Sequence, residues 1–282
     1  MKVLILGGTG MLGTDIAAIM EKAGHDVIVH GSQETDITGL DCVIKTAAAH
    51  KPQVIINSAA ITDVDKCEAE PDNAYRVNAI GPKNAAIACR KFKAKLVHIS
   101  TDYVFDGEKG SPYTEFDAPN PVNIYGKSKL LGEDFVKSIC NDYCIIRVAW
   151  LFGTKRSHFV DYVADSLVKG SEIIAVKDMV SSPTYAADAA SMISKLAVSE
   201  EAGTFHSCNK GYCSRVQLVE EIMKITNKKG PVKVVNQSQW LRLAKRPAFS
   251  ALKNHHLGLI DKDEMAGWRD ALKRYMRYKL NK

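Results

Sequence analysis

Short apolar runs alternate with longer amphipathic stretches along the first half of the 282-residue chain. A run of about four to eight apolar, often β-branched residues between turn residues is typical of a buried strand in a parallel sheet. Such runs lie at residues 2–6, 26–30, 54–57, 97–100 and 143–153. Apolar residues at helical spacing predict helices over 14–23, 40–51, 125–137 and 75–93, the last interrupted at Gly81-Pro82. This alternation predicts an α/β fold with a doubly wound parallel sheet.

The alternation becomes less regular after residue 152. Strands are predicted at 173–176, 203–206 and 232–235, and helices at 158–168, 186–196, 214–226 and from about residue 264. The pattern predicts a smaller α+β lobe that binds the substrate in a cleft against the sheet. We therefore expect a dinucleotide-binding domain over residues 1–150 and a substrate-binding lobe over 151–282, with segments of about 176–206 returning to the first domain.

Composition is that of a soluble globular protein, with 46% hydrophobic and 25% charged residues. No apolar run approaches the roughly 20 residues that span a bilayer. The apolar N-terminus continues into Gly7-Gly8-Thr9-Gly10, without a signal-peptide cleavage pattern. Seven cysteines without a CxxC pair favour reduced thiols over disulfides or a metal site. These features predict a cytoplasmic protein that does not associate with membranes.

The net charge is +6, and residues 269–279 are strongly basic. An apolar stripe through this segment predicts a solvated C-terminal helix, and no nucleic-acid-binding motif accompanies it. A mild positive excess also suits an anionic small-molecule substrate. We therefore expect no nucleic-acid partner.

A glycine-rich turn follows the first predicted strand and precedes the first predicted helix. Gly7, Gly10 and Gly13 are spaced three residues apart and enclose Met11 and Leu12. In a dinucleotide-binding fold such glycines allow a tight turn, close approach of the backbone to a pyrophosphate, and packing of helix on strand. The turn predicts a Rossmann-type domain with the cofactor phosphates at the helix N-terminus.

The residues after the second and third strands bear on the choice of cofactor. The second strand ends in His30, followed by Gly31 and Ser32, where an acidic residue would bind the ribose of NAD. Neither an acid nor a base stands there, so we expect NADPH, with NADH as a second accepted cofactor. The remaining predicted cofactor contacts are Asp36 and Ile37 beside the adenine, Ala59, Ala60 and Thr62 at the end of the third strand, and Tyr125 and Lys129 beside the nicotinamide ribose.

The stretch from residue 97 to residue 129 carries the candidate chemistry. Thr101 ends a predicted strand, and Tyr125 and Lys129 share one face of a helix because they are four residues apart. A phenol beside an ammonium can deliver a proton to a carbonyl oxygen that a hydroxyl polarises, while a nicotinamide supplies hydride. We expect Lys129 and a cationic nicotinamide to lower the pKa of Tyr125. Asp102 either orients Thr101 or binds sugar hydroxyls.

Several motifs in order resemble those of extended short-chain dehydrogenases/reductases, and most closely the dTDP-4-dehydrorhamnose reductase family. Besides the glycine turn, they are NSAAITDVD at 57–65, STDYVFDG at 100–107, PVNIYGKSKL at 121–130, Arg147 with Trp150, SPT at 182–184, and Arg246-Pro247. The chain departs from the family pattern at Met11, at Val148-Ala149 and within residues 178–184. These departures border the predicted sugar pocket.

The resemblance implies reduction of the 4-keto group of a nucleotide-linked deoxysugar, dTDP-4-dehydro-L-rhamnose, to dTDP-L-rhamnose. It implies that Thr101, Tyr125 and Lys129 are catalytic. The substrate contacts that it implies are Thr101, Asp102, Val104, Trp150 and Arg246, with Arg246 near the nucleotide diphosphate. Asp15 lies where some family members bind Mg²⁺ at a dimer contact, but one carboxylate is little for this cation, and we expect no essential metal. A homodimer remains open.

Two other functions fit parts of the pattern. One is a cofactor-binding regulatory protein resembling the β subunit of methionine adenosyltransferase, and the other is a nucleotide-sugar epimerase or dehydratase. The presence of Thr101, Tyr125 and Lys129 together favours an enzyme. Tyr103 after Asp102, in place of a second acidic residue, disfavours a dehydratase.

Overall fold

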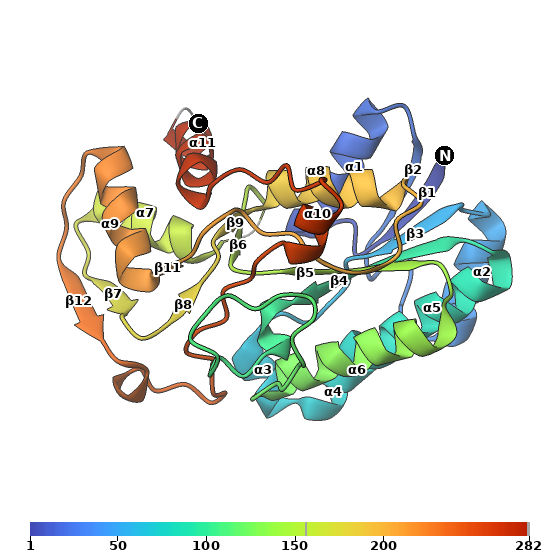
Figure 1. Ribbon diagram of the computed structural model, residues 1–282, viewed down its shortest axis with the longest axis horizontal. Coiled ribbons are helices and arrows are strands. Elements are labelled where there is room, and N and C mark those ends of the chain that lie inside the picture. Colours follow the sequence, from blue (N-terminus) through green and yellow to red (C-terminus); the bar gives the residue numbers. More distant parts are fainter. Residues whose placement is uncertain (156, 281–282) are drawn as a thin grey trace.

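A six-stranded parallel sheet forms the centre of the molecule in the computed structural model, which describes residues 1–155 and 157–280 (Figure 1). The strand order β10-β5-β4-β3-β1-β2 reverses direction between β1 and β3, as in a doubly wound fold. The strands are β1 (Lys2–Leu6), β2 (Asp26–His30), β3 (Val54–Asn57), β4 (Lys95–Thr101), β5 (Tyr143–Val148) and β10 (Gly203–His206). The predicted Rossmann-type α/β fold is confirmed.

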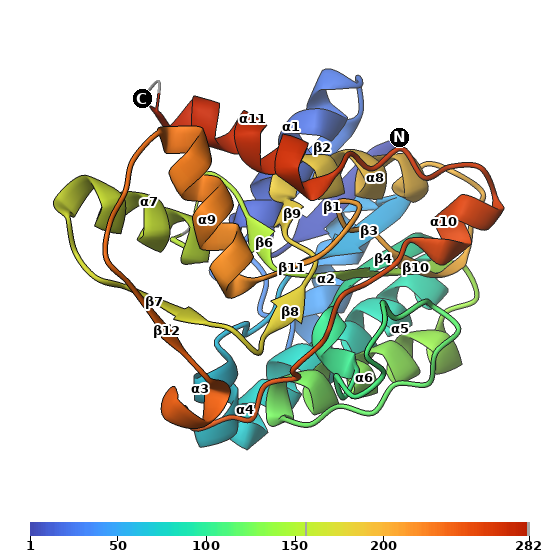
Figure 2. The same ribbon diagram turned by 60° about the vertical axis from the view of Figure 1, so that its left-hand side comes forward.

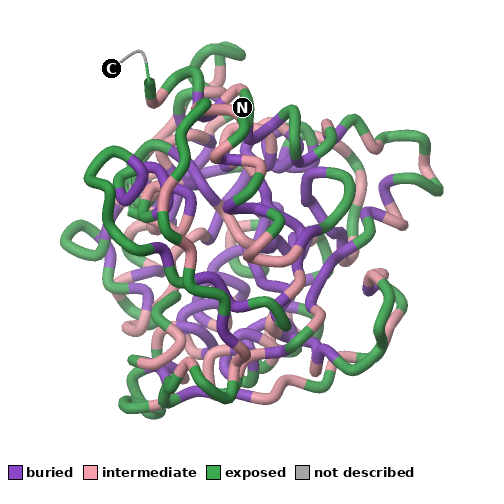
Figure 3. Tube along the Cα trace, turned by 90° about the vertical axis from the view of Figure 1, so that its left-hand side faces the viewer, coloured by how far each residue is buried: buried purple, intermediate pink, exposed green. Residues whose placement is uncertain are grey.

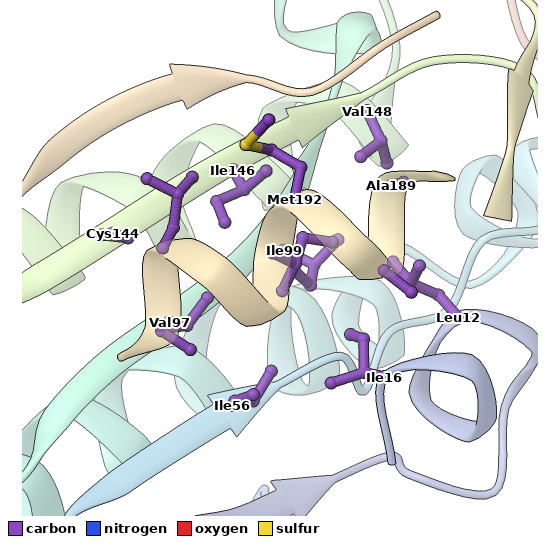
Figure 4. Close-up of a cluster of buried hydrophobic side chains, with 14 of the residues drawn as sticks. Leu12, Ile16, Ile56, Val97, Ile99, Cys144, Ile146, Val148, Ala189 and Met192 are labelled. Carbon is purple, nitrogen blue, oxygen red and sulfur yellow. The ribbon is translucent and has the colours of Figure 1, made fainter. Parts of the chain in front are cut away.

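Helices cover both faces of the sheet because its strands are apolar on both sides. The helices of one face are α1 (Met11–Lys22) and α8 (Ala186–Ala197), and those of the other are α2 (Leu40–His50), α5 (Gly81–Phe92) and α6 (Ile124–Ile139). Figure 4 shows the first of these cores, where Leu12, Ile16 and Met192 meet Ile56 and Val97 of the strands. The C-terminal ends of the strands are thereby left open for a ligand.

A second, smaller lobe packs helices on a two-stranded parallel sheet (Figure 2). Its elements are α7 (Phe159–Lys169), β7 (Ile173–Val176), α9 (Arg215–Thr226), β12 (Val232–Val235) and α11 (Trp268–Leu280). Two short strand pairs join the lobe to the sheet domain. They are β6 (Leu151–Phe152) with β9 (Thr184–Tyr185), and β8 (Val180–Ser181) with β11 (Cys213–Ser214). A short helix, α10 (His255–Leu259), lies beside β10. Figure 3 shows buried backbone through the interior and exposed backbone on the outer turns.

Three expected elements differ from the structure. The helix over 75–93 is not interrupted at Gly81-Pro82. Three helical elements follow one another directly: α4 (Pro71–Tyr75), a π-helical turn (Arg76–Ile80) and α5. Pro82 lies in the first turn of α5, where the N–H that proline lacks would have no partner within the helix. The strand over 143–153 ends at Val148, since Trp150 has φ +38° and turns the chain toward β9. The final helix begins at Trp268, four residues after Glu264.

Two further expectations concern the cysteines and membrane-spanning helices. All seven cysteines are free thiols, as predicted. Among the described residues, no helix is both long and apolar enough to span a membrane. The acidic segment that begins at Asp63 starts a short helix, α3 (Val64–Ala69), in which the Asp63 carboxylate accepts a hydrogen bond from the Lys66 N–H at 3.0 Å.

Candidate active site

A cavity of about 900 Å³ opens at the C-terminal ends of the central strands and extends to Trp150 at the smaller lobe. Most of the predicted site residues line it, although they come from segments far apart in the chain. They are Gly7, Gly10, Met11, Leu12, Gly13, Asp36, Ile37, Ala59, Ala60, Thr62, Thr101, Asp102, Tyr125, Lys129 and Trp150. His30, Val104 and Arg246 do not line it.

The glycine turn leaves its backbone open toward this cavity. Gly7 has φ +73°, and a Cβ atom there would lie 2.5 Å from the Ala59 nitrogen. A Cβ atom on Gly13 would lie 2.7 Å from the Gly7 carbonyl oxygen. Gly10 is the N-cap of α1 and has no side chain to cover the first N–H groups of the helix. These residues therefore fit a dinucleotide pyrophosphate, which the helix N-terminus favours.

At the far end of the cavity, Gly31, Ser32 and Thr35 follow β2. His30 lies outside because its Nδ1 is hydrogen-bonded to Thr35 Oγ1 at 2.7 Å, so the structure offers no support for it as a direct cofactor contact. Glu34 accepts a hydrogen bond from the Gly31 N–H at 2.8 Å. The Glu34 carboxylate thus lies at the turn after β2, where the sequence was expected to place no charged side chain. Sequence reasoning missed it because Glu34 comes four residues after the end of the strand.

Thr101 and Asp102 are buried at the end of β4. The Thr101 hydroxyl donates to Asp102 Oδ1 at 3.1 Å, and its oxygen accepts from the Tyr103 N–H at 3.2 Å. Asp102 Oδ2 accepts from the hydroxyls of Ser181 at 3.0 Å and Ser250 at 2.5 Å. Burial raises the pKa of Asp102 to about 6 despite these three donors. Asp102 therefore holds Thr101 in place and joins β4 to the smaller lobe.

Tyr125 stands in the first turn of α6, which Asn123 caps by accepting from the Gly126 N–H at 2.8 Å. Gly126 lets the helix approach β4 closely, because a Cβ atom there would lie 2.1 Å from the Tyr103 carbonyl oxygen. The Tyr125 side chain is thereby brought within hydrogen-bonding reach of Thr101. Burial dominates the titration of Tyr125 and raises its pKa, so the groups of the protein itself do not produce the expected lowering.

Lys129 lies one helical turn further along and is buried. Its Nζ donates to the Ile99 carbonyl oxygen at 2.5 Å. Burial lowers its pKa to about 8, and the Glu133 carboxylate opposes that change. Glu133 is itself held by Arg147 through two bonds of 2.9 and 2.7 Å. At neutral pH Lys129 is therefore mostly an ammonium in the wall of the cavity.

The side of the cavity facing the smaller lobe contains Trp150 in the left-handed region, with φ +38°. A residue other than glycine adopts this conformation only where the surroundings enforce it, and such positions cluster at functional sites. The Trp150 ring is covered by Arg215, whose Cζ lies 3.5 Å from the ring centroid. The sequence offers no local signal for this contact, since 65 positions separate the two residues.

The two other predicted substrate residues have different surroundings. Val104 is fully buried in a small core with Phe105 and Leu252, so the structure offers no support for it as a direct contact. Arg246 Nη1 donates to Asp65 Oδ1 at 2.9 Å and to the Ala244 carbonyl oxygen at 2.7 Å. Its role in binding substrate stays a prediction.

No group of three His, Cys, Asp or Glu side chains in the described part of the chain could hold a metal ion. Asp15, the one candidate that the resemblance offered, is partly buried in α1, and burial raises its pKa. The side chains that line the cavity support proton transfer from the Tyr125 phenol, with the Thr101 hydroxyl and the Lys129 ammonium in the same cavity.

Comparison with known protein families gives one match over nearly the whole chain. The family model described as the RmlD substrate binding domain matches residues 1–280. The spore coat polysaccharide biosynthesis protein SpsK of Bacillus subtilis is 35% identical over 280 residues, which cover 98% of this chain and 96% of that protein. Further relatives, 33–35% identical, bear the name dTDP-4-dehydrorhamnose reductase.

Solved structures agree with this match. A dTDP-4-dehydrorhamnose reductase from Clostridium acetobutylicum is 41% identical, with a TM-score of 0.96 over 99% of this chain and 100% of that one. A dTDP-4-dehydrorhamnose reductase from Bacillus anthracis, solved in complex with NADP, is 38% identical, with a TM-score of 0.95 over 98% and 99% of the two chains.

Proposed function

The chain belongs to the RmlD substrate-binding-domain family, which includes the dTDP-4-dehydrorhamnose reductases, and we propose that it reduces the 4-keto group of a nucleotide-linked deoxysugar with NADPH. The substrate that relatives' names indicate is dTDP-4-dehydro-L-rhamnose, and the product is then dTDP-L-rhamnose. The observation that carries the proposal is the convergence of Thr101, Tyr125 and Lys129 on the cavity that also contains the glycine turn.

The cofactor fits the residues present. The open backbone at Gly7, Gly10 and Gly13 would hold the pyrophosphate, and the residues after β2 and β3 would border the adenosine and the nicotinamide ribose. A bound NADPH supplies the hydride that adds to the carbonyl carbon of the sugar. NADP in a 38% identical relative supports this choice of cofactor.

The protein supplies the proton and stabilises the developing charge. Tyr125 is a neutral phenol at pH 7, because burial raises its pKa, and it donates its proton to the carbonyl oxygen of the substrate. Thr101, held by Asp102 and the Tyr103 N–H, hydrogen-bonds the same oxygen. The Lys129 ammonium stabilises the phenolate that remains after transfer.

The test is turnover of NADPH, followed by its absorbance, with dTDP-, UDP- and GDP-linked 4-keto sugars side by side. We expect turnover with the dTDP sugar. Tyr125→Phe should lower kcat by about 10²- to 10⁴-fold, the usual contribution of general acid catalysis, while the affinity for NADPH is retained. Tyr143→Phe is the matched control, because Tyr143 lies on β5 outside the cavity lining. A Tyr125→Phe enzyme with the wild-type rate would contradict the assignment.

The alternatives predict other results in the same assay. A regulatory protein would bind NADPH and turn over none of the sugars, and an epimerase would act without net oxidation of NADPH. The presence of a complete Thr101, Tyr125 and Lys129 set in one cavity favours an enzyme over a regulatory protein, and the reductase names of relatives at 33–35% identity favour the reductase over an epimerase. The expectations of a cytoplasmic location and of a homodimer accompany the proposal, and light scattering of the purified protein tests the second.

A further inference from the structure

Arg215 is a cation without a charged partner. Its Cζ lies 3.5 Å from the centroid of the Trp150 ring and 4.4 Å from that of Phe159. Within residues 1–155 and 157–280, its guanidinium makes neither an ion pair nor a hydrogen bond. Burial lowers its pKa to about 10, so the side chain stays charged at neutral pH. Stacking occupies the faces of the guanidinium and leaves its N–H edges available.

Other arginines in low-exposure positions have carboxylate partners. Arg147 is bound twice by Glu133, and Arg246 donates to Asp65. This is the general rule, because a charge taken out of water is costly unless it is paired and hydrogen-bonded. Arg215 departs from that rule, so the expected partner is an anion that is not part of the chain.

The position of Arg215 indicates where this anion binds. Trp150, Tyr103 and Asp102 all line the cavity, and the charge of Arg215 acts on both Tyr103 and Asp102. Asp102 does not pair with Arg215, since its oxygens accept from the three hydroxyl groups described above. Trp150, held in a left-handed conformation, provides the flat surface on which the guanidinium rests.

We propose that Arg215 binds the diphosphate of the nucleotide sugar, and that Trp150 orients the guanidinium for this contact. The inference rests on the proposed function for the identity of the anion. It assigns Arg215, not found by sequence reasoning, as a substrate-positioning residue on the first turn of α9. A planar guanidinium suits phosphate oxygens because it offers two parallel N–H donors.

The experiment compares dTDP with thymidine, which lacks the phosphates, by calorimetry on the protein saturated with NADP⁺. We expect the wild-type protein to bind dTDP more tightly than thymidine. Arg215→Met should weaken dTDP binding by about 10- to 100-fold, as for loss of a charge-assisted hydrogen bond, and leave thymidine within about two-fold. Arg215→Lys keeps the charge without the planar donors, so the loss should be smaller.

Arg269→Met is the matched control. Arg269 also stacks on a tryptophan, with its Cζ 4.4 Å from the Trp268 ring centroid, but it is paired with Glu221, and Trp268, unlike Trp150, does not line the cavity. Its substitution should leave both affinities unchanged. Circular dichroism verifies folding, and if Arg215→Met does not fold, the dTDP-to-thymidine ratio of Arg215→Lys decides.

Three results would overturn the proposal. One is an unchanged dTDP-to-thymidine ratio in the folded Arg215 variants. Another is an equal loss for both ligands, which would mean that Arg215 only supports Trp150. The third is weaker binding of NADP⁺ with unaffected dTDP, which would assign the anion to the cofactor. None of these measurements needs turnover, so failure of the proposed reaction is detected separately, in the keto-sugar assay.

Discussion

Lys129 sets an upper pH limit for the proposed reaction. Burial lowers its pKa to about 8, so the ammonium one helical turn from Tyr125 is lost as the pH rises through that value. We expect kcat/KM to fall above about pH 8, because the phenolate left by Tyr125 then has no neighbouring positive charge. Steady-state kinetics between roughly pH 6 and 10 measure the decline.

Lys129→Arg provides the control for this assignment, since a guanidinium keeps its charge over the whole range. The variant should be slower than the wild type because the longer side chain must replace the bond to the Ile99 carbonyl oxygen. Its basic limb should move to higher pH. An identical basic limb in both proteins would show that another group titrates.

Glu34 is expected to influence the choice between NADPH and NADH. Its carboxylate is held at the Gly31 N–H, at the end of the cavity where the adenosine ribose is expected, and no Lys or Arg of the described chain lines the cavity there. Glu34→Gln retains a hydrogen-bond acceptor and removes the negative charge. The ratio of kcat/KM for NADPH to that for NADH should rise about two- to five-fold, the size of an exposed charge interaction.

Glu21→Gln is the matched control, because Glu21 is an exposed glutamate on α1, whereas Glu34 is bonded to Gly31 of the cavity lining. It should leave the NADPH to NADH ratio unchanged. A ratio in Glu34→Gln that equals the wild-type value would mean that the 2′-phosphate lies out of reach of Glu34.

At the scale of elements, the pair of Glu133 and Arg147 joins α6 to β5. Both side chains are buried, and Glu133 also accepts from the Ser100 hydroxyl of β4 at 2.6 Å. Glu133→Gln leaves the Arg147 charge buried without a counter-charge and should lower the free energy of unfolding by about 3–5 kcal/mol. Urea unfolding at pH 7 measures the change, with exposed Glu220→Gln as the control.

The same pair gives a pH dependence of stability. Despite burial, Arg147 and the neighbouring donors lower the pKa of Glu133 to about 2, from the ordinary 4.5. Its ionisation therefore stabilises the fold fully above about pH 4.5, and this contribution is lost as the pH falls toward 2. The difference in unfolding free energy between wild type and Glu133→Gln should shrink over that range. A constant difference would contradict the assignment.

Elements were predictable where local pattern and packing agree. Apolar runs identified the strands of the central sheet, and apolar residues at helical spacing identified the helices that cover it. Contacts between distant segments could not be predicted in this way. The break at Trp150 depends on the pairing of β6 with β9, and the position of Arg215 over Trp150 depends on how α9 packs. The glycine turn and the Tyr125–Lys129 pair were accessible because each is local in sequence.

At the scale of the whole molecule, the chain passes repeatedly between the sheet domain and the smaller lobe. Residues 186–206 return to the sheet as α8 and β10, and Leu257 and Met265 belong to the same core as the residues of β1. Asp102 adds hydrogen bonds to Ser181 and Ser250. We propose that the two lobes unfold together as one cooperative unit. The boundary near residue 150 then separates cofactor binding from substrate binding, but it does not separate two independently folding domains.

This proposal predicts a single unfolding transition. Heating should change circular dichroism and tryptophan fluorescence together, and the calorimetric and van't Hoff enthalpies should agree, because the core of the sheet domain is incomplete without α8, Leu257 and Met265. NADP⁺ at about 100 times its Kd should raise the single midpoint by several degrees, since binding at that ratio adds roughly 2.7 kcal/mol to the folded state. Trp150, Trp240 and Trp268 all lie after residue 149, so fluorescence reports the C-terminal half while circular dichroism reports the whole chain. The contradicting result is two separate transitions, with NADP⁺ raising only the midpoint of the transition that shows no change in fluorescence. It would identify two independently folding domains.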